Sequence, residues 1–176
     1  MPRKKNELWE WTKALMIALA LAGIIRYLLF APIVVDGDSM LPTLQDNNRM
    51  IVNKVVYSIS DVNRFDIVVF HATENKDYIK RVIALPGETI KYENDKLYIN
   101  GELVEEPFLQ EIRLENPERY TTYIEEMKVP EGHVYVLGDN RNHSRDSRHI
   151  GPISVEEIIG EANIVFWPFA EFRYIK

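Results

Sequence analysis

The most prominent pattern in the sequence is an almost unbroken run of apolar residues from position 8 to position 30. A helix rises about 1.5 Å per residue and needs roughly 20 residues to cross a hydrocarbon core about 30 Å thick. Trp9 and Trp11 stand at one end of the run, where aromatic rings favour the level of the lipid headgroups. The pattern therefore predicts a transmembrane signal anchor over residues 8–30.

Basic residues set the predicted orientation of this helix, and those near its amino-terminal end are Arg3, Lys4, Lys5 and Lys13. Cytoplasmic flanks of membrane helices are rich in Lys and Arg. We therefore expect residues 1–7 to be cytoplasmic and residues 31–176 to lie outside the cell membrane. A cleaved secretory signal is an alternative, because residues 14–25 have the length of its apolar core. The continuation to Phe30 and the lack of an Ala-x-Ala site before Pro32 argue against it.

After Pro32 the pattern changes to short segments rich in Val, Ile, Tyr and Phe, separated by Gly, Asn, Asp and Pro. This change predicts a mainly β fold, with one β-rich domain over residues 31–176. Asn100-Gly101 is typical of a two-residue hairpin turn between residues 97–99 and 102–104. The other predicted strands are residues 33–35, 50–56, 67–70, 78–85, 89–92, 133–137 and 164–167.

One helix is expected in this domain, because Ser154 and Glu157 have the spacing of a capping box and Gly160 supplies a stop. Residues 105–123 are polar without a clear period, and we expect them to be an excursion from the β core.

Composition removes several classes of function. The net charge is −6, which argues against a nucleic-acid partner because phosphate binding needs a basic surface. Cysteine is absent, so thiolate chemistry and disulfides are excluded. No metal-ligand spacing links the four histidines, so we expect neither a metal nor another cofactor; they are His71, His133, His143 and His149.

A serine in a turn and a lysine in a strand are the candidates for chemistry. Ser39 lies in a Gly-containing segment, residues 36–43, although a turn serine is more often only a capping hydroxyl. Lys80 lies in the middle of the predicted strand 78–85, where burial would lower its pKa and make its amine a usable base. Adjacent Arg81 leaves an alternative open, in which both bases lie on a solvated edge strand.

A third cluster of polar residues occupies positions 138–148, directly after a predicted strand. It is either a solvated, turn-rich loop or a support for the nucleophile and base, in which hydrogen bonds and an Asp–Arg pair brace the loop.

On these segments the chain resembles bacterial type I signal peptidases of the short, single-anchor kind, over nearly its whole length. Four motifs occur in the order found in that family: a serine box at residues 38–44, a structural box at 63–70, a lysine box at 78–82 with Pro86-Gly87, and a loop box at 138–148. Each motif alone is weak evidence, but their joint order is strong.

The resemblance implies that Ser39 is the nucleophile and Lys80 the general base of a serine endopeptidase. Ser144 would orient the lysine amine, and further support would come from Asp139, Asp146 and Arg148. The implied substrates are exported preproteins with small residues one and three positions before the cut in the signal peptide, and the lipid bilayer is the second implied partner. Enzymes of the two-anchor kind carry a hydroxyl two positions before the nucleophile, where this chain has Gly37. The backbone N–H of Ser39 is then the expected oxyanion donor.

Apolar residues near the predicted site indicate a membrane contact. Leu41 follows the nucleophile in a turn, and Trp167 belongs to an aromatic cluster near the end of the chain. We expect Leu41 and Trp167 to form a lip that enters the headgroup layer, with ordinary core packing as the alternative. Two other functions stay open from the residues alone: a self-cleaving repressor with a similar dyad, and a tethered β module that catalyses nothing.

Overall fold

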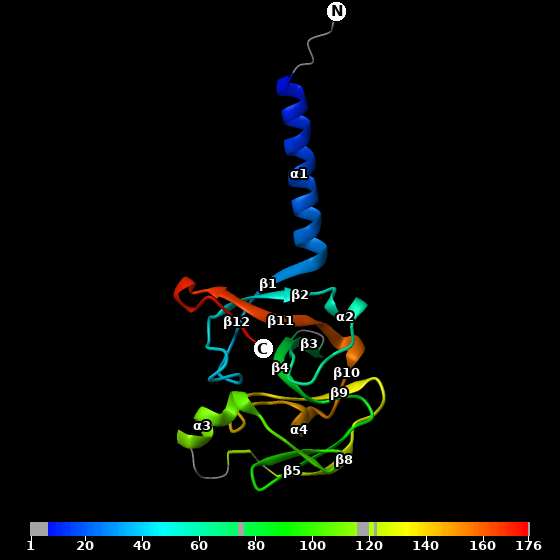
Figure 1. Cartoon of the computed structure of the whole chain (residues 1–176), viewed down its shortest axis with the longest axis vertical. Helices are drawn as coiled ribbons and strands as arrows, with labels where there is room; N and C mark the ends of the chain where they lie inside the picture. Colours follow the sequence, from blue (N-terminus) through cyan, green and yellow to red (C-terminus); the bar gives the residue numbers. More distant parts are fainter. Residues whose placement is uncertain (1–6, 74–75, 116–119, 122, 176) are drawn as a thin grey trace, which may run out of the picture.

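The structure of the chain is a computed structural model that describes residues 7–73, 76–115, 120–121 and 123–175. The bases Arg3, Lys4 and Lys5, on which the predicted orientation rests, lie outside the described residues. Helix α1 (Glu7–Leu29) stands apart from the rest of the chain (Figure 1). Among the described residues it is the one helix long and apolar enough to cross a membrane, by length and composition. Large apolar side chains along it, including Leu8 and Leu15, are exposed.

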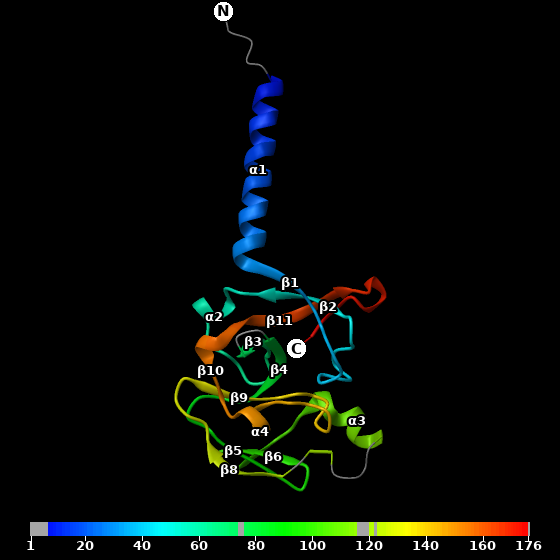
Figure 2. The ribbon, with the colours of Figure 1, turned by 180° about the vertical axis from the view of Figure 1, so that it is seen from behind.

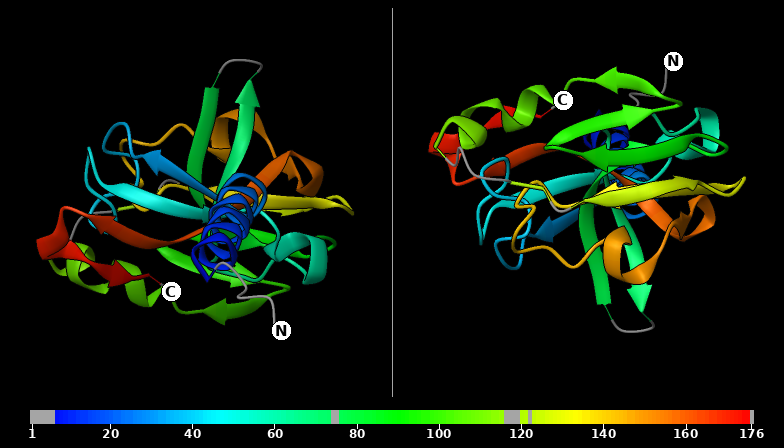
Figure 3. Two further views of the ribbon diagram at one scale, coloured as in Figure 1. Left: turned by 90° about the horizontal axis from the view of Figure 1, so that it is seen from above. Right: turned by 90° about the horizontal axis from the view of Figure 1, so that it is seen from below.

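The rest of the chain is β-rich, as the sequence predicted, and its larger sheet has eight strands. The order is β1-β2-β11-β3-β4-β9-β10, with β12 paired to β11, and the described pairings are antiparallel. The strands are β1 (Phe30–Val34), β2 (Arg49–Asn53), β3 (Ile67–Thr73), β4 (Lys76–Ala84), β9 (His133–Leu137), β10 (Ile153–Ser154), β11 (Ile158–Trp167) and β12 (Arg173–Tyr174). Strands β3 and β4 project beyond the rest of the domain (Figure 3).

Strand β3 shows why this sheet holds a core on both faces. Ile67 and Val69 pack into a cluster with residues of β2 and β11, whereas Val68 and Phe70 pack on the opposite face with β9. Because successive strand residues point to opposite faces, a strand buried on both sides needs a continuous apolar run. Residues 67–70 supply that run.

A second sheet lies at the end of the domain farthest from α1 (Figures 1 and 2). Its order is β7-β6-β5-β8. The strands are β5 (Thr89–Glu93), β6 (Lys96–Ile99), β7 (Glu102–Val104) and β8 (Ile124–Lys128). Tyr135 and Leu137 of β9 pack into the core of this sheet, so β9 joins the two sheets. Asn100 and Gly101 have φ values of 52° and 83°, which confirms the predicted hairpin turn because that turn needs positive φ at both positions.

The prediction of a helix from Ser154 to Gly160 is wrong in its length. The capping box forms, but it caps only the 3₁₀ turn η2 (Val155–Glu157), after which the chain continues as β11. Gly160 does not end a helix. A Cβ at this position would lie 2.2 Å from the carbonyl oxygen of Asn53, so the glycine permits close approach of β2.

The remaining elements are short. Within the predicted excursion at residues 105–123, the described residues 107–115 form η1 (Pro107–Leu109) and α3 (Gln110–Glu115), which lie outside the two sheets. The predicted strand 50–56 ends at Asn53 and is followed by α2 (Val56–Ile59). The sequence also gave no sign of α4 (Ser147–Ile150) or of η3 (Phe169–Glu171).

Candidate active site

The register of β4 places Lys80 inside the larger sheet. Strand β4 lies between β3 and β9, and Lys80 is paired with Val68 of β3. The alternative of two bases on a solvated edge strand is therefore wrong: Lys80 is 4% exposed and Arg81 is 0% exposed. Because neighbouring residues of a strand point to opposite faces, the side chains of Lys80 and Arg81 contact different residues.

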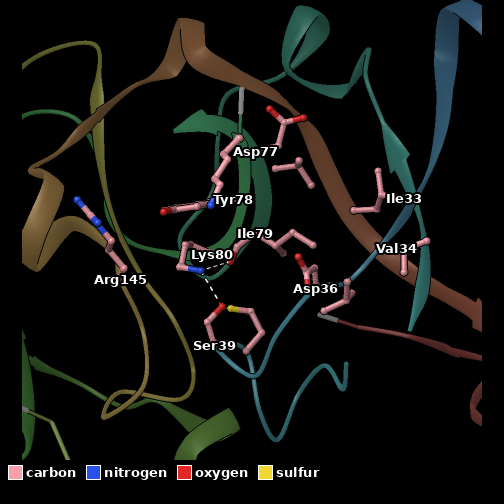
Figure 4. Close-up of a pocket in the computed structure, with 13 residues that line it drawn as sticks. Ile33, Val34, Asp36, Ser39, Asp77, Tyr78, Ile79, Lys80 and Arg145 are labelled. Carbon is pink, nitrogen blue, oxygen red and sulfur yellow. Dashed lines mark hydrogen bonds between the residues drawn. The ribbon is translucent and has the colours of Figure 1, made fainter. Parts of the chain in front are cut away.

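Ser39 comes to the same place from a turn that begins after β1. The Gly37 N–H donates to Asp46 Oδ1 over 2.9 Å, and the Leu41 N–H donates to the Asp38 carbonyl over 3.2 Å. Lys80 Nζ donates to Ser39 Oγ over 2.8 Å and to the Ile79 carbonyl over 2.8 Å (Figure 4). The structure thus brings together the two residues that the sequence selected separately.

The surroundings of Lys80 favour the neutral amine. Burial lowers its pKa from 10.5 to about 8, although the charges of Asp146 and Asp139 act in the opposite direction. The nitrogen also lies 5.2 Å from the centre of the Tyr78 ring. At a pH near 8 a substantial fraction of the amine can accept a proton, which an ordinary surface lysine cannot do.

Arg81, the residue after Lys80 in β4, forms a buried ion pair with Asp139. Arg81 donates from Nε to Asp139 Oδ1 over 2.9 Å and from Nη2 to Oδ2 over 2.7 Å, and both side chains are 0% exposed. Arg81 also donates to the Phe65 carbonyl and lies 4.0 Å from the centre of the Phe108 ring. The sequence predicted a supporting role for Asp139 but not its partner Arg81, because the two residues are 58 positions apart.

A second Asp–Arg pair lies within the loop itself. Arg148 donates to both carboxylate oxygens of Asp146 over 2.8 Å, and Asp146 accepts the Gly138 N–H over 3.0 Å. Burial alone would raise the pKa of Asp146, but the charge and hydrogen bonds of Arg148 and the Gly138 amide lower it. The carboxylate therefore stays ionised and fixes the loop after β9.

Ser144 is buried beside Gly138, and its hydroxyl does not hydrogen-bond to Lys80. Its hydroxyl makes no hydrogen bond of normal geometry within the described part of the chain, although its proximity helps to lower the pKa of Asp146. A Cβ at Gly138 would lie 2.2 Å from Ser144 Oγ and 2.4 Å from the Ser39 carbonyl. Only glycine fits where these two serine segments converge.

The dyad opens into a cleft of about 600 Å³ between the end of β1 and the length of β4 (Figure 4). Its wall from the β1 side includes Ile33, Val34 and Asp36, and its wall from β4 includes Asp77 and Ile79. Both strands reach the cleft as extended backbone. The shape suits an extended peptide laid between them with its scissile bond at Ser39.

Comparison with known proteins agrees with this geometry. The family model described as "Signal peptidase, peptidase S26" matches residues 8–167. The chain belongs to the signal peptidase family. Signal peptidase I of Bacillus amyloliquefaciens is 45% identical over 99% of this chain and 93% of its own length. Signal peptidase IB of Staphylococcus aureus is 38% identical over 97% of this chain and 95% of its own.

A solved structure agrees with the fold. The crystal structure of a signal peptidase I from Enterococcus faecalis is 38% identical, with a TM-score of 0.54, and covers 58% of this chain and 97% of that one. Like its relatives, the chain is a serine peptidase and therefore a hydrolase. The single apolar helix suggests membrane anchoring of this signal peptidase.

Space beside the nucleophile is open in the peptidase. A Cβ at Gly37 would meet nothing within 4 Å, but its φ of +89° disfavours other residues. The Ser39 N–H makes no hydrogen bond within the described residues. Elsewhere in the described chain, no cluster of three or more His, Asp or Glu side chains is arranged to hold a metal ion.

The two residues of the predicted membrane lip differ in exposure. Leu41 is half-buried, whereas Trp167 is 42% exposed. Phe169 is 74% exposed, and its ring packs edge-on against Trp167 at 4.9 Å between centres. Arg49 lies over the Trp167 ring at 5.8 Å. Leu41 is thus partly packed in the domain, whereas the rings of Trp167 and Phe169 are not in the core.

Proposed function

We propose that this signal peptidase is a single-pass membrane enzyme that removes signal peptides from exported preproteins through a Ser39–Lys80 dyad. The observation that carries the proposal is the 2.8 Å contact between Lys80 Nζ and Ser39 Oγ at the base of a peptide-sized cleft. A buried lysine of lowered pKa beside a serine hydroxyl has the two properties that a base and a nucleophile need.

The reaction follows from this contact. Neutral Lys80 takes the hydroxyl proton while Ser39 Oγ attacks the scissile carbonyl carbon, and the backbone N–H of Ser39 donates to the oxyanion. The Lys80 ammonium returns the proton to the leaving amine as the C–N bond breaks, which leaves an ester on Ser39. Water then gives a proton to Lys80 and attacks the ester, and Ser39 recovers its proton as the acyl group departs.

The remaining site residues have supporting roles in this proposal. Asp139 pairs with Arg81, the residue after Lys80 in β4, and so fixes this strand to the loop. The pair of Asp146 and Arg148 fixes the loop after β9. Ser144, which is buried beside Gly138, orients the lysine amine in this proposal once substrate excludes water. No cofactor takes part in any of these steps.

The anchor brings enzyme and substrate to one surface. With residues 1–7 in the cytoplasm and α1 crossing the bilayer, residues 31–176 face the outside, where exported preproteins emerge. Two reactants held at the same membrane meet at raised effective concentration. The substrate then needs only a short extended segment between the membrane and the cleft.

Leu41 and Trp167 form the proposed membrane lip of this enzyme. The aromatic turn after β11 lies at the level of β1 and β2, at the end of the domain that carries α1 but displaced sideways from the helix, whereas the segment between β1 and β2 runs away from that end (Figures 1 and 2). Exposed aromatic rings favour the headgroup layer. We therefore expect Trp167 to contribute more to membrane contact than the half-buried Leu41.

The direct test uses the purified full-length protein in detergent with a preprotein as substrate. Ser39→Ala and Lys80→Ala are each expected to reduce cleavage by at least about 10³-fold, because they remove the nucleophile and the base. Ser60→Ala, at the exposed end of α2, is the matched control and should cleave normally. EDTA should leave the rate unchanged. Cleavage by Ser39→Ala, or inhibition by EDTA that zinc reverses, would contradict the proposal.

A further inference from the structure

A buried cluster of charges lies between the active-site loop and the second sheet, and the reaction does not use it. Its centre is Arg141, which is 1% exposed. Arg141 Nε donates to the Gly138 carbonyl over 3.1 Å. Its Nη1 donates to the Tyr92 hydroxyl over 3.1 Å and to Thr121 Oγ1 over 3.2 Å, and its Nη2 donates to Glu106 Oε1. Every nitrogen of this guanidinium therefore has a partner.

Glu106 is the charge that balances Arg141. It lies just before η1 in the polar excursion and is 2% exposed. Its other oxygen accepts from Arg113 over 2.6 Å and from the Tyr92 hydroxyl. Burial alone would raise the pKa of Glu106, but Arg141 and its other partners lower it, so the carboxylate stays ionised. A buried arginine without such a partner is strongly disfavoured.

The loop that Arg141 holds also holds the nucleophile. The Asn140 N–H donates to the Ser39 carbonyl over 3.1 Å, and Asn140 Nδ2 donates to the Asp38 carbonyl over 3.0 Å. Gly138 packs so closely on the Ser39 carbonyl that a Cβ would come within 2.4 Å of it. The backbone of Ser39 thus rests against the segment that Arg141 fixes.

Tyr120 strengthens the same connection from the excursion. Its hydroxyl donates to the Asp139 carbonyl over 2.8 Å and accepts the Arg141 N–H over 3.3 Å. This one hydroxyl therefore contacts backbone groups of the loop on both sides of Asn140. Tyr120 does not line the cleft.

We infer that Glu106 is a positioning residue for Ser39, acting through Arg141 and the backbone of residues 138–140. This inference rests on the proposed role of Ser39 as nucleophile. A small displacement of a reacting group can reduce a rate by about 10²-fold. Loss of the Glu106 charge should therefore lower kcat, while the walls of the cleft, and with them KM, stay as they are.

The test compares Glu106→Gln with Glu88→Gln in the full-length protein, assayed on a preprotein well below both melting temperatures. Glu88 is a matched control because it also receives two donors from one arginine, Arg64, at 2.6 and 2.9 Å, but does not contact the loop. We expect Glu106→Gln to lower kcat about 10- to 100-fold with KM changed less than about threefold. Glu88→Gln should keep kcat within about threefold, even where its melting temperature falls.

Two further variants keep the test decisive if Glu106→Gln does not fold. Tyr92→Phe removes one hydroxyl from the cluster, and we expect it to lower kcat severalfold at unchanged KM. Tyr57→Phe, which removes a hydroxyl bonded to Asp66 far from the loop, is its control and should retain kcat. Glu106→Asp, which keeps the charge, should recover part of the kcat lost in Glu106→Gln.

Each result supports or overturns the inference. If folded Glu106→Gln and Tyr92→Phe keep the parent kcat, or if their kcat falls no more than that of the controls, Glu106 has only a structural role. If the parent protein cleaves no preprotein, or if Ser39→Ala cleaves it, the proposed function fails instead. The parent and Ser39→Ala reactions thus separate the two failures.

Discussion

The two sheets of the domain contribute to the site in different ways. The larger sheet supplies the base directly, because Lys80 lies on a strand with neighbours on both sides and is 4% exposed. The smaller sheet supplies none of the residues that line the cleft. It meets the active-site loop through buried groups that begin in β5 and continue in the excursion before β8, such as Tyr92 and Tyr120.

This difference separates two physical effects. In the larger sheet, burial acts on one amine and changes its chemistry, since desolvation lowers the pKa of Lys80. Between the smaller sheet and the active-site loop, burial is offset by paired charges, so Arg141 and Glu106 stay ionised and act through geometry. Substitutions in the first region should alter the reaction itself, and substitutions in the second should alter its alignment.

Lys80→Arg should have the largest effect on the reaction. Guanidinium does not deprotonate at accessible pH, so this variant keeps a cation but loses the base. We expect cleavage of a preprotein to fall by at least about 10³-fold while the protein remains folded and membrane-bound. Substantial turnover by purified Lys80→Arg would remove the lysine from the role of base.

Asp139→Asn should give the largest loss of stability. Removing one charge from the Arg81–Asp139 pair leaves a fully buried, unpaired arginine, which typically costs about 3–5 kcal/mol. Glu88→Gln breaks a pair whose side chains are 22% and 18% exposed, and we expect about 1 kcal/mol. Urea unfolding of both variants measures the difference. Equal losses would mean that burial does not distinguish these pairs.

The pH dependence of cleavage should follow Lys80. Its pKa is lowered to about 8, and the neutral form is the active one. Below pH 8 we therefore expect kcat/KM to rise by about tenfold per pH unit, and above it to level off. The profile of the Glu106→Gln variant should keep the same midpoint at a lower plateau. A parent midpoint near 10 would show that burial does not activate the lysine.

The smallest expected effect concerns the membrane lip. In a protein with Trp9→Phe and Trp11→Phe, Trp167 is the remaining tryptophan. We expect lipids brominated on their acyl chains to quench its fluorescence in bilayers. Tyr98→Trp, with Trp167→Phe, places the probe on the smaller sheet far from α1 and should not be quenched (Figure 1). Equal quenching at both positions would argue against a specific lip.

The sequence predicted those parts that depend on local pattern. Period-2 alternation identified the strand that carries Lys80. Asn100-Gly101 identified a hairpin because the ability to adopt positive φ depends on the residue itself. Gly160 misled the prediction for the same reason. By local rules, a glycine after a capping box ends a helix. Here, however, the glycine is needed because the carbonyl of Asn53, far away in sequence, leaves no room for a Cβ.

The missed contacts around the site are all long-range. Arg81 reaches Asp139 across 58 positions, and Arg141 reaches Glu106 across 35. No spacing rule connects charges so far apart, because the register of three strands and the path of the excursion bring them together. Residues 105–123 are polar without a clear period, so the sequence predicts an excursion from the β core but not the burial of Glu106, Tyr120 and Thr121 within it.

The junction between α1 and β1 limits how far the active site can lie from the end of the helix. The helix ends at Leu29, the strand begins at Phe30, and the Lys54 N–H ties the last helical carbonyl to β2 over 3.0 Å. From Phe30 to Ser39 an extended chain can reach at most about 30 Å. With α1 in the proposed membrane orientation, Ser39 lies within this distance of the bilayer surface, and the distance of a peptide bond from the membrane would then help to decide whether it is cut.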